Sequence, residues 1–205
     1  MFKDRIEAGE KLAQKLEKYK NKDAVILGIP RGGIVVASVV SKILNLPLDI
    51  IIIKKIGLPG DEEFAIGATG IDAFSVNQGR IKEFSVSKET LDAEIKIKQK
   101  EAKERYNFLS KNRSPQILKN KEVILIDDGI ATGETMGLAV QIVKKQGAKK
   151  VIVAVPVSSE QSLKKIKADE IICVLTSESL GAIGEFYIDF STVEDLEVKK
   201  ILENG

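Results

Sequence analysis

The residues best suited to bind a ligand lie at 123–135, where a short apolar run ends in two adjacent carboxylates. Asp127 and Asp128 follow the run Val-Ile-Leu-Ile, and a turn containing glycine and threonine leads from them into a helical pattern. Carboxylates only accept hydrogen bonds, so this pair suits the vicinal hydroxyls of a sugar. A helix start offers unpaired N–H groups and the positive end of its dipole to a phosphate. The combination indicates a sugar phosphate, most simply ribose 5-phosphate.

The turn after the acid pair supplies further groups for a phosphate. Thr132 and Thr135 add hydroxyl donors, and Gly133 permits a close approach of the backbone. In a plainer interpretation Asp128 caps the helix and Asp127 is solvated. That interpretation suits an isolated Asp-Asp pair better than it suits the whole pattern. The segment contains neither the Gly-Lys-Ser/Thr of a P-loop nor the Gly-x-Gly-x-x-Gly of a dinucleotide site.

Two other segments combine a turn with positive charge. Residues 28–33 (Gly-Ile-Pro-Arg-Gly-Gly) end another apolar run, and the guanidinium of Arg31 suits phosphate oxygens. A purely structural turn is the alternative for that stretch. Lys54 and Lys55 close a third apolar run, where two cations would neutralise a charged leaving group. Solvated lysines at a strand end are the alternative there.

Together these segments resemble the type I phosphoribosyltransferases. Residues 123–135 match the family's phosphoribosyl pyrophosphate motif: four hydrophobic residues, two acids, a short hydrophobic step and Thr-Gly-x-Thr. The resemblance implies that Asp127 and Asp128 hold the ribose 2′- and 3′-hydroxyls and that the next loop holds the 5′-phosphate. The substrate-binding residues expected in that loop are Gly129, Ala131, Thr132, Gly133, Glu134 and Thr135.

The resemblance also implies a site for the pyrophosphate. The Pro-Arg-Gly-Gly stretch corresponds to the family's pyrophosphate loop, which often contains a non-proline cis peptide. Lys55 stands at the position of the family's functional lysine, and Lys54 replaces the usual arginine. Arg31 and Lys55 are therefore the expected catalytic residues. The remaining substrate contacts expected on this side are Pro30, Gly32, Gly33 and Lys54.

The resemblance covers the whole chain and is greatest to a branch of predicted phosphoribosyltransferases from bacteria and archaea. The branch begins with Asp-Arg-x-x-Ala-Gly, and this pattern is matched by Asp4, Arg5, Ala8 and Gly9. Residues 63–68 and 186–191 match two further stretches of the branch. The sequence alone does not indicate what the residues in these three matched stretches do.

Two departures from the family concern the acceptor. The branch usually has a Phe-Tyr pair where this chain has Ser179 and Leu180. Type I members often stack an aromatic side chain of a C-terminal hood on the nucleobase, so we expect Phe186 or Tyr187 to do so. Ala131 replaces the aspartate that hypoxanthine-guanine-type members use as a proposed general base, which argues against copying their purine mechanism. The carboxylates without an assigned role are Glu62, Glu63 and Glu134.

Composition excludes several other classes of protein. The 205 residues are 43% hydrophobic and 30% charged with a net charge of +2, which argues for a globular chain and against nucleic acid as a partner. The chain has no histidine, so His-dependent triads and His-ligated metal sites are excluded. The single cysteine, Cys173, excludes an internal disulfide and lies in an apolar run. The charged start and the lack of a long apolar run predict a cytoplasmic protein without membrane contact.

The elements that must position these residues alternate between strand and helix. Strands are expected at 24–29, 48–53, 123–126, 151–155 and 171–175, and helices at 6–18, from 33 to about 44, 134–146 and 159–167. This alternation predicts an α/β fold with a mostly parallel twisted sheet and helices on both faces. Ligands bind such sheets at the carboxyl ends of the strands, where both glycine-bearing turns lie.

We expect one domain over residues 1–205, with an insertion at about 57–112 and C-terminal hood elements at about 176–205. Within the insertion, 57–84 should form a loop with a small antiparallel hairpin, which could close as a lid, and 88–110 a long charged helix. The alternating Lys and Glu of that helix suit a partner surface, or a solvated face with i,i+4 ion pairs.

The resulting functional hypothesis is an enzyme that moves ribose 5-phosphate from phosphoribosyl pyrophosphate to a nitrogenous small-molecule acceptor. Mg²⁺ is the expected cofactor, held mainly by ligand oxygens and contacted only indirectly by Asp127 and Asp128. The alternative is a sensor of the same fold that binds phosphoribosyl pyrophosphate or a nucleotide without turnover. An unrelated sugar-phosphate protein is a third interpretation. The family resemblance leaves a homodimer open.

Overall fold

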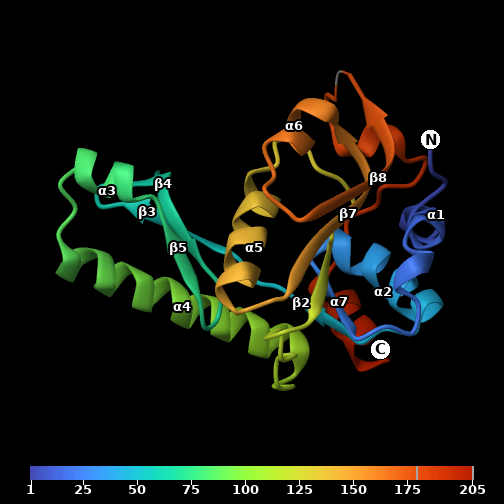
Figure 1. The fold of residues 1–205 in the computed structure, drawn as a ribbon, viewed down its shortest axis with the longest axis horizontal. Coiled ribbons are helices and arrows are strands. Elements are labelled where there is room, and N and C mark those ends of the chain that lie inside the picture. The colour runs from blue at the N-terminus through green and yellow to red at the C-terminus, as the bar shows by residue number, and fades with distance from the viewer. Residues whose placement is uncertain (179, 205) are drawn as a thin grey trace.

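A five-stranded parallel sheet forms the centre of the protein (Figure 1). The structure is a computed structural model that describes residues 1–178 and 180–204. In spatial order the strands are β2 (Leu48–Ile50), β1 (Ala24–Gly28), β6 (Glu122–Ile126), β7 (Lys150–Ser159) and β8 (Glu170–Ser177). The predicted α/β class with a parallel sheet is therefore confirmed.

The central strands are apolar along their whole length because helices cover both faces of the sheet. Ile26, Ile124 and Ile152 point to one face, while their neighbours Val25 and Val123 point to the other. The first face is covered by α1 (Arg5–Lys15), α2 (Gly32–Leu44) and α7 (Asp195–Glu203). The second is covered chiefly by α5 (Glu134–Lys145), with α6 (Glu160–Lys164) at its edge.

The order of the strands creates a crevice at the carboxyl end of the sheet. From β1 the chain runs through α2 to β2 on one side, and later returns to β6 on the other side of β1. The connections thus diverge between β1 and β6, and such a switch point is where open α/β sheets bind ligands. The Pro-Arg-Gly-Gly turn follows β1 and the acid pair follows β6, so the fold brings both predicted loops to this crevice.

Residues 54–110 form a projection that we call the arm (Figure 1). It contains a three-stranded antiparallel sheet of β3 (Lys54–Leu58), β4 (Asp61–Thr69) and β5 (Phe74–Val76), followed by α3 (Gln78–Glu83) and α4 (Lys88–Ser110). Its small core includes Ile56, Ile66 and Ile95. The predicted hairpin and long helix are present, but the sheet begins three residues earlier than expected and has a third strand.

Polar contacts, buried at Asp49 and partly buried at Arg105, hold the base of the arm against the body. Asp49 at β2 accepts hydrogen bonds from the Tyr106 hydroxyl at 2.9 and 3.1 Å and from the Gln116 N–H at 2.8 Å. Arg105 on α4 forms two hydrogen bonds of 2.6 Å with Asp195 on α7. These contacts fix where the arm leaves the sheet, and with it the position of Lys54 and Lys55.

Several expected boundaries were wrong. The first helix ends at Lys15 and is followed by a 3₁₀ turn, η1 (Glu17–Tyr19), because the helix carbonyls are already satisfied in that tighter turn. β2 stops at Ile50, and β7 continues to Ser159, which shortens the following helix to five residues. The sequence analysis missed α3, α7 and the 3₁₀ turn η2 (Ile183–Phe186). In the described part of the chain, no helix is both long and apolar enough to cross a membrane.

Two glycines inside helices should respond oppositely to alanine. A Cβ on Gly9 of α1 would lie 2.8 Å from the Cβ of Val39 on α2, whereas a Cβ on Gly137 of α5 would meet nothing within 4 Å. Gly9→Ala should therefore destabilise the protein by about 1–2 kcal/mol through overpacking. Gly137→Ala should stabilise it by about 0.5–1 kcal/mol through helix propensity. Urea denaturation of both variants measures this, and a Gly9→Ala protein as stable as the unchanged one would contradict the packing of α1 on α2.

Candidate active site

The acid pair lies at the carboxyl end of β6 and is held by contacts from distant segments. Asp127 Oδ1 accepts the Asp128 N–H at 2.9 Å. Asp128 Oδ2 accepts from Arg5 Nε at 2.8 Å, and the Asp128 carbonyl accepts from the Tyr187 hydroxyl at 2.7 Å. The protein's own contacts thus orient both the carboxylates and their backbone.

The Pro-Arg-Gly-Gly turn packs directly against these carboxylates. A Cβ on Gly32 would overlap Asp128 Oδ2, and a Cβ on Gly33 would lie 2.7 Å from Asp127 Oδ1. Only glycine allows this approach at both positions. The Pro30–Arg31 peptide bond is cis, which is the feature that the family resemblance implied for this turn.

Desolvation disfavours charge on both acids of the pair. Burial raises the pKa of Asp127 well above the usual value, and the neighbouring Asp128 carboxylate raises it further. Burial also raises the pKa of Asp128, although the Arg5 guanidinium opposes that shift. Donors such as sugar hydroxyls would satisfy these oxygens, so the pair is better suited to a bound diol than to bare solvent.

The loop after the acid pair is fixed by β7 and α6. The Ile130 N–H donates to the Val157 carbonyl at 2.9 Å, and the Ser158 hydroxyl donates to the Ile130 carbonyl at 3.0 Å. The Ser162 hydroxyl donates to the Ala131 carbonyl. Gly129 is buried beneath Ile183 of η2. The loop is therefore held in place from outside the predicted motif.

The first turn of α5 is open to an anion. Gly133 has φ of 81° at the N-cap, a left-handed conformation that favours glycine, and makes no side-chain cap. Thr132 Oγ1 is 3.4 Å from the Glu134 N–H, a weak contact. Thr132, Glu134 and Thr135 are exposed. Uncapped N–H groups and nearby hydroxyls are the arrangement expected for a phosphate site.

The three predicted cations each pair with a glutamate from another element. Arg31 lies 3.7 Å from Glu194, Lys54 lies 3.3 Å from Glu101, and Lys55 lies 3.0 Å from Glu134. All six side chains are more than one-third exposed. Exposed pairs of this kind contribute only about 0–1 kcal/mol each, so a phosphate could replace the glutamates at little cost.

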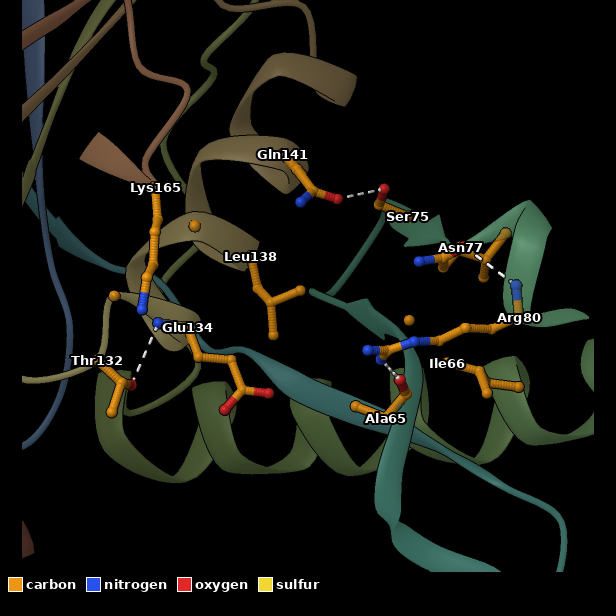
Figure 2. A pocket seen from close by; sticks show the side chains of 14 residues that line it. Ala65, Ile66, Ser75, Asn77, Arg80, Thr132, Glu134, Leu138, Gln141 and Lys165 are labelled. Atoms are coloured by element: carbon orange, nitrogen blue, oxygen red, sulfur yellow. Dashed lines mark hydrogen bonds between the residues drawn. The ribbon is translucent and has the colours of Figure 1, made fainter. Parts of the chain in front are cut away.

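Two cavities border the phosphate loop. One of about 240 Å³ is lined by Pro30, Lys54 and Thr135, together with apolar residues of 29 and 51–53 and with Arg105. It brings together three predicted site residues from three separate segments. The other, of about 610 Å³, lies between the arm and α5 (Figure 2).

The larger cavity has charged groups on opposing walls. Figure 2 shows Glu134, Thr132 and Lys165 on one side and Arg80 of the arm on the other, with Leu138 between them. Arg80 donates to the Ala65 carbonyl, and Ser75 donates to Gln141 at 2.7 Å, which links the arm to α5. The phosphate loop is therefore open toward the arm as well as toward the sheet.

The aromatic residues expected to stack on a base differ in accessibility. Tyr187 is 5% exposed, and its ring lies 5.3 Å from that of Phe2 and 4.9 Å from that of Phe190. Phe186 is partly buried against the same cluster. Ser179, where the branch has part of its Phe-Tyr pair, lies outside the described residues, as does the side chain of Glu63. The stacking role stays a prediction.

Residues that the sequence analysis left without a role complete the site. Arg5 contacts Asp128 from 123 positions away, while Ser158 and Ser162 hold the phosphate loop. The match of the N-terminal residues to the branch pattern drew attention to Arg5, but it did not predict where the Arg5 side chain lies. The serines had no signal, since β7 was expected to end before them.

The carboxylates present suit the expected Mg²⁺ only in an indirect role. Among the described residues, no group of three or more Asp, Glu or Cys side chains gathers as a metal site. Asp127 and Asp128 are adjacent, and Asp128 already binds Arg5. A Mg²⁺ that takes most of its oxygens from a ligand and from water is compatible with this arrangement.

Comparisons with known proteins agree on a family. The family model described as phosphoribosyl transferase domain matches residues 3–191. A protein of Mycobacterium tuberculosis named "Putative phosphoribosyl transferase" is 35% identical over 208 residues, which cover 100% of this chain and 47% of that protein. The chain thus spans about half the length of the curated relatives it matches.

Solved structures share the fold. The crystal structure of TT1426 from Thermus thermophilus has a TM-score of 0.88 and 33% identity, covering 100% of this chain and 98% of the other. A purine phosphoribosyltransferase from Pyrococcus horikoshii has a TM-score of 0.51 and 22% identity, covering 93% of each chain. A hypothetical protein from Neisseria gonorrhoeae with bound ppGpp has a TM-score of 0.50 and 16% identity, covering 100% and 98%.

The raised pKa of Asp127 gives a testable pH dependence of stability. Because the folded state binds this proton more tightly than the unfolded state, stability is fully present below the unfolded pKa and falls as pH rises through the folded pKa. Asp127→Asn removes that loss, so its stability relative to the unchanged protein should rise as the pH rises above the usual carboxyl range. Thermal denaturation in EDTA measures this.

A matched control is Asp72→Asn, because Asp72 is exposed and forms no part of the site. This variant should show no pH-dependent gain. If the stability of Asp127→Asn relative to the unchanged protein does not rise with pH, the burial of this carboxyl group is contradicted.

Proposed function

The chain belongs to the phosphoribosyl transferase domain family, and on that premise we propose that it transfers ribose 5-phosphate from phosphoribosyl pyrophosphate to a nitrogenous acceptor. One observation carries the proposal. The acid pair, the Pro-Arg-Gly-Gly turn and the uncapped start of α5 meet at one switch point of the sheet. A diol, a pyrophosphate and a 5′-phosphate could be bound there at the same time.

The rigid part of the site suits the sugar phosphate. Asp127 and Asp128 would accept hydrogen bonds from the ribose 2′- and 3′-hydroxyls. The N–H groups at Glu134 and Thr135, with the hydroxyls of Thr132 and Thr135, would bind the 5′-phosphate. Because hydrogen bonds from other elements hold both segments, the ribose would be fixed without reorganisation of the protein.

The exposed cations suit the leaving group. In the proposed reaction a nitrogen lone pair of the acceptor forms a bond to ribose C1 while the bond from C1 to the pyrophosphate oxygen breaks. The electron pair leaves with pyrophosphate, and the acceptor nitrogen loses its proton to solvent or to a nearby base. Arg31 and Lys55 would stabilise the negative charge that develops on the leaving oxygen. Mg²⁺, when bound with the substrate, would supply further neutralisation of the pyrophosphate.

A non-catalytic sensor of the same fold is the second candidate. Two observations favour it: Ala131 provides no general base, and the Tyr187 ring is buried and not open to a base. A structural neighbour named for bound ppGpp is compatible with nucleotide binding by this fold. Turnover separates the two candidates. A cytoplasmic location and a homodimer stay predictions.

Substitution of both acids should weaken the affinity for the sugar. Asp127→Asn combined with Asp128→Asn replaces two carboxyl acceptors of hydrogen bonds by weaker amide acceptors, so phosphoribosyl pyrophosphate should bind about 100-fold or more weakly. The fold should persist because the amides keep the same shape. Fluorescence or calorimetric titration measures the affinity, and circular dichroism checks the fold. Unchanged affinity in a folded double variant would rule out the assignment of the diol site.

The proposed transfer is tested by release of pyrophosphate from phosphoribosyl pyrophosphate and Mg²⁺ with a panel of purines, pyrimidines and simple amines. At least one acceptor should give acceptor-dependent release, and Lys55→Ala should slow it by about 10²–10³-fold. Lys100→Ala, which removes an exposed lysine of α4, should leave the rate unchanged. Tight binding with no release for any acceptor would favour the sensor.

A further inference from the structure

The conspicuous feature outside the predicted site is the position of Arg5, the first residue of α1. Its guanidinium makes three contacts: Nε donates to Asp128 Oδ2 at 2.8 Å, Nη1 donates to the Ser191 carbonyl at 2.8 Å, and its carbon lies 3.8 Å from the centre of the Phe190 ring. The side chain of Arg5 is 11% exposed and that of Asp128 is 15% exposed. The guanidinium is thus held on three sides.

The N-terminal residues that match the branch pattern position Arg5 next to Asp128. Asp4 caps α1 by accepting from the N–H groups of Ile6 and Glu7, both at 2.9 Å. Ala8 is fully buried, and Gly9 lets α1 approach α2 closely. Because α2 begins at Gly32, the first turn of α1 is fixed relative to the same turn that packs on the acid pair.

Arg5, Gly32 and Asp128 converge at one place. A Cβ on Gly32 would lie 2.9 Å from Arg5 Nε as well as overlapping the Asp128 carboxylate. A buried ion pair contributes little net stability after its desolvation cost, so stability alone does not explain this placement. A carboxylate has about four acceptor positions, so Arg5 can hold Asp128 and leave other positions for a hydroxyl.

We propose that Arg5 is a positioning residue of the sugar site: it holds the Asp128 carboxylate in the orientation that accepts the ribose 2′-hydroxyl, and so sets the preference for ribose over 2-deoxyribose. This inference rests on the proposed function. Arg5 acts through Asp128 and does not itself contact the sugar. Phe190 and Ser191 take part by fixing the guanidinium, which assigns a role to the C-terminal segment.

The test compares the affinities for ribose 5-phosphate and 2-deoxyribose 5-phosphate by calorimetric titration. The unchanged protein should prefer ribose 5-phosphate by about ten- to a hundredfold, the worth of one hydrogen bond to a charged group. Arg5→Gln should lose most of this preference by weakening ribose 5-phosphate alone, with the affinity for the 2-deoxy sugar changed less than about twofold. In an Asp128→Asn background, Arg5→Gln should cause no further loss.

Two more variants keep the test decisive. Arg5→Lys retains a donor but cannot reach Asp128 and Ser191 together, so it should restore only part of the preference. If Arg5→Gln fails to fold, Arg5→Lys replaces it in the test. An unchanged preference for ribose 5-phosphate in Arg5→Lys would then overturn the inference. Arg113→Gln removes an arginine that donates to the Leu202 carbonyl, and it should lower thermal stability without changing the preference.

The outcomes separate the inference from the proposed function. If the unchanged protein binds neither sugar phosphate, or binds both equally, the diol site and the inference both fail. If it prefers ribose 5-phosphate and Arg5→Gln keeps that preference, only the inference fails. If Arg5→Gln weakens both ligands equally, Arg5 has a structural role alone, which also overturns the inference.

Discussion

The close approach of Gly32 and Gly33 to the carboxylates of Asp127 and Asp128 is the constraint on which the rest of the site depends. No Cβ fits at either glycine, so this contact exists only because β1 and β6 are neighbours with their turns at the same edge. Both acids are only partly exposed, and the desolvation of their carboxyl groups raises the pKa of each. Stability at neutral pH is thereby reduced in favour of two oriented acceptors, a trade common at functional sites.

The site divides into a rigid part and an adjustable part. Side-chain hydrogen bonds hold the acid pair and the phosphate loop in place. They come from Arg5, Tyr187, Ser158 and Ser162. The cations at 31, 54 and 55 instead lie in exposed pairs with glutamates. This division suits a reaction in which the sugar stays fixed while a charged group departs. The arm contributes two of these cations, so its attachment through Asp49 and Arg105 links its position to the leaving-group side.

The order of elements and the two turns that form the candidate site could be predicted because they depend on local patterns. Continuous apolar runs marked the buried strands, and residues 28–33 and 123–135 marked the two turns. Arg5 could not be placed in this way, since its contact with Asp128 depends on how α1 packs on α2. The burial of Tyr187 had no local signal either, because it depends on Phe2 and Phe190. The helix α3 was missed because its segment is only six residues long and none of its residues is buried.

The central claim is that the crevice between β1 and β6 binds phosphoribosyl pyrophosphate, and calorimetric titration of that ligand with and without Mg²⁺ tests it most directly. The account predicts saturable, Mg²⁺-dependent binding that is tighter than the binding of ribose 5-phosphate, because only the diphosphate ligand engages Arg31 and Lys55. Absence of binding, or equal affinity for both ligands regardless of Mg²⁺, would contradict it. The acid pair and the phosphate loop would then serve a different phosphate ligand.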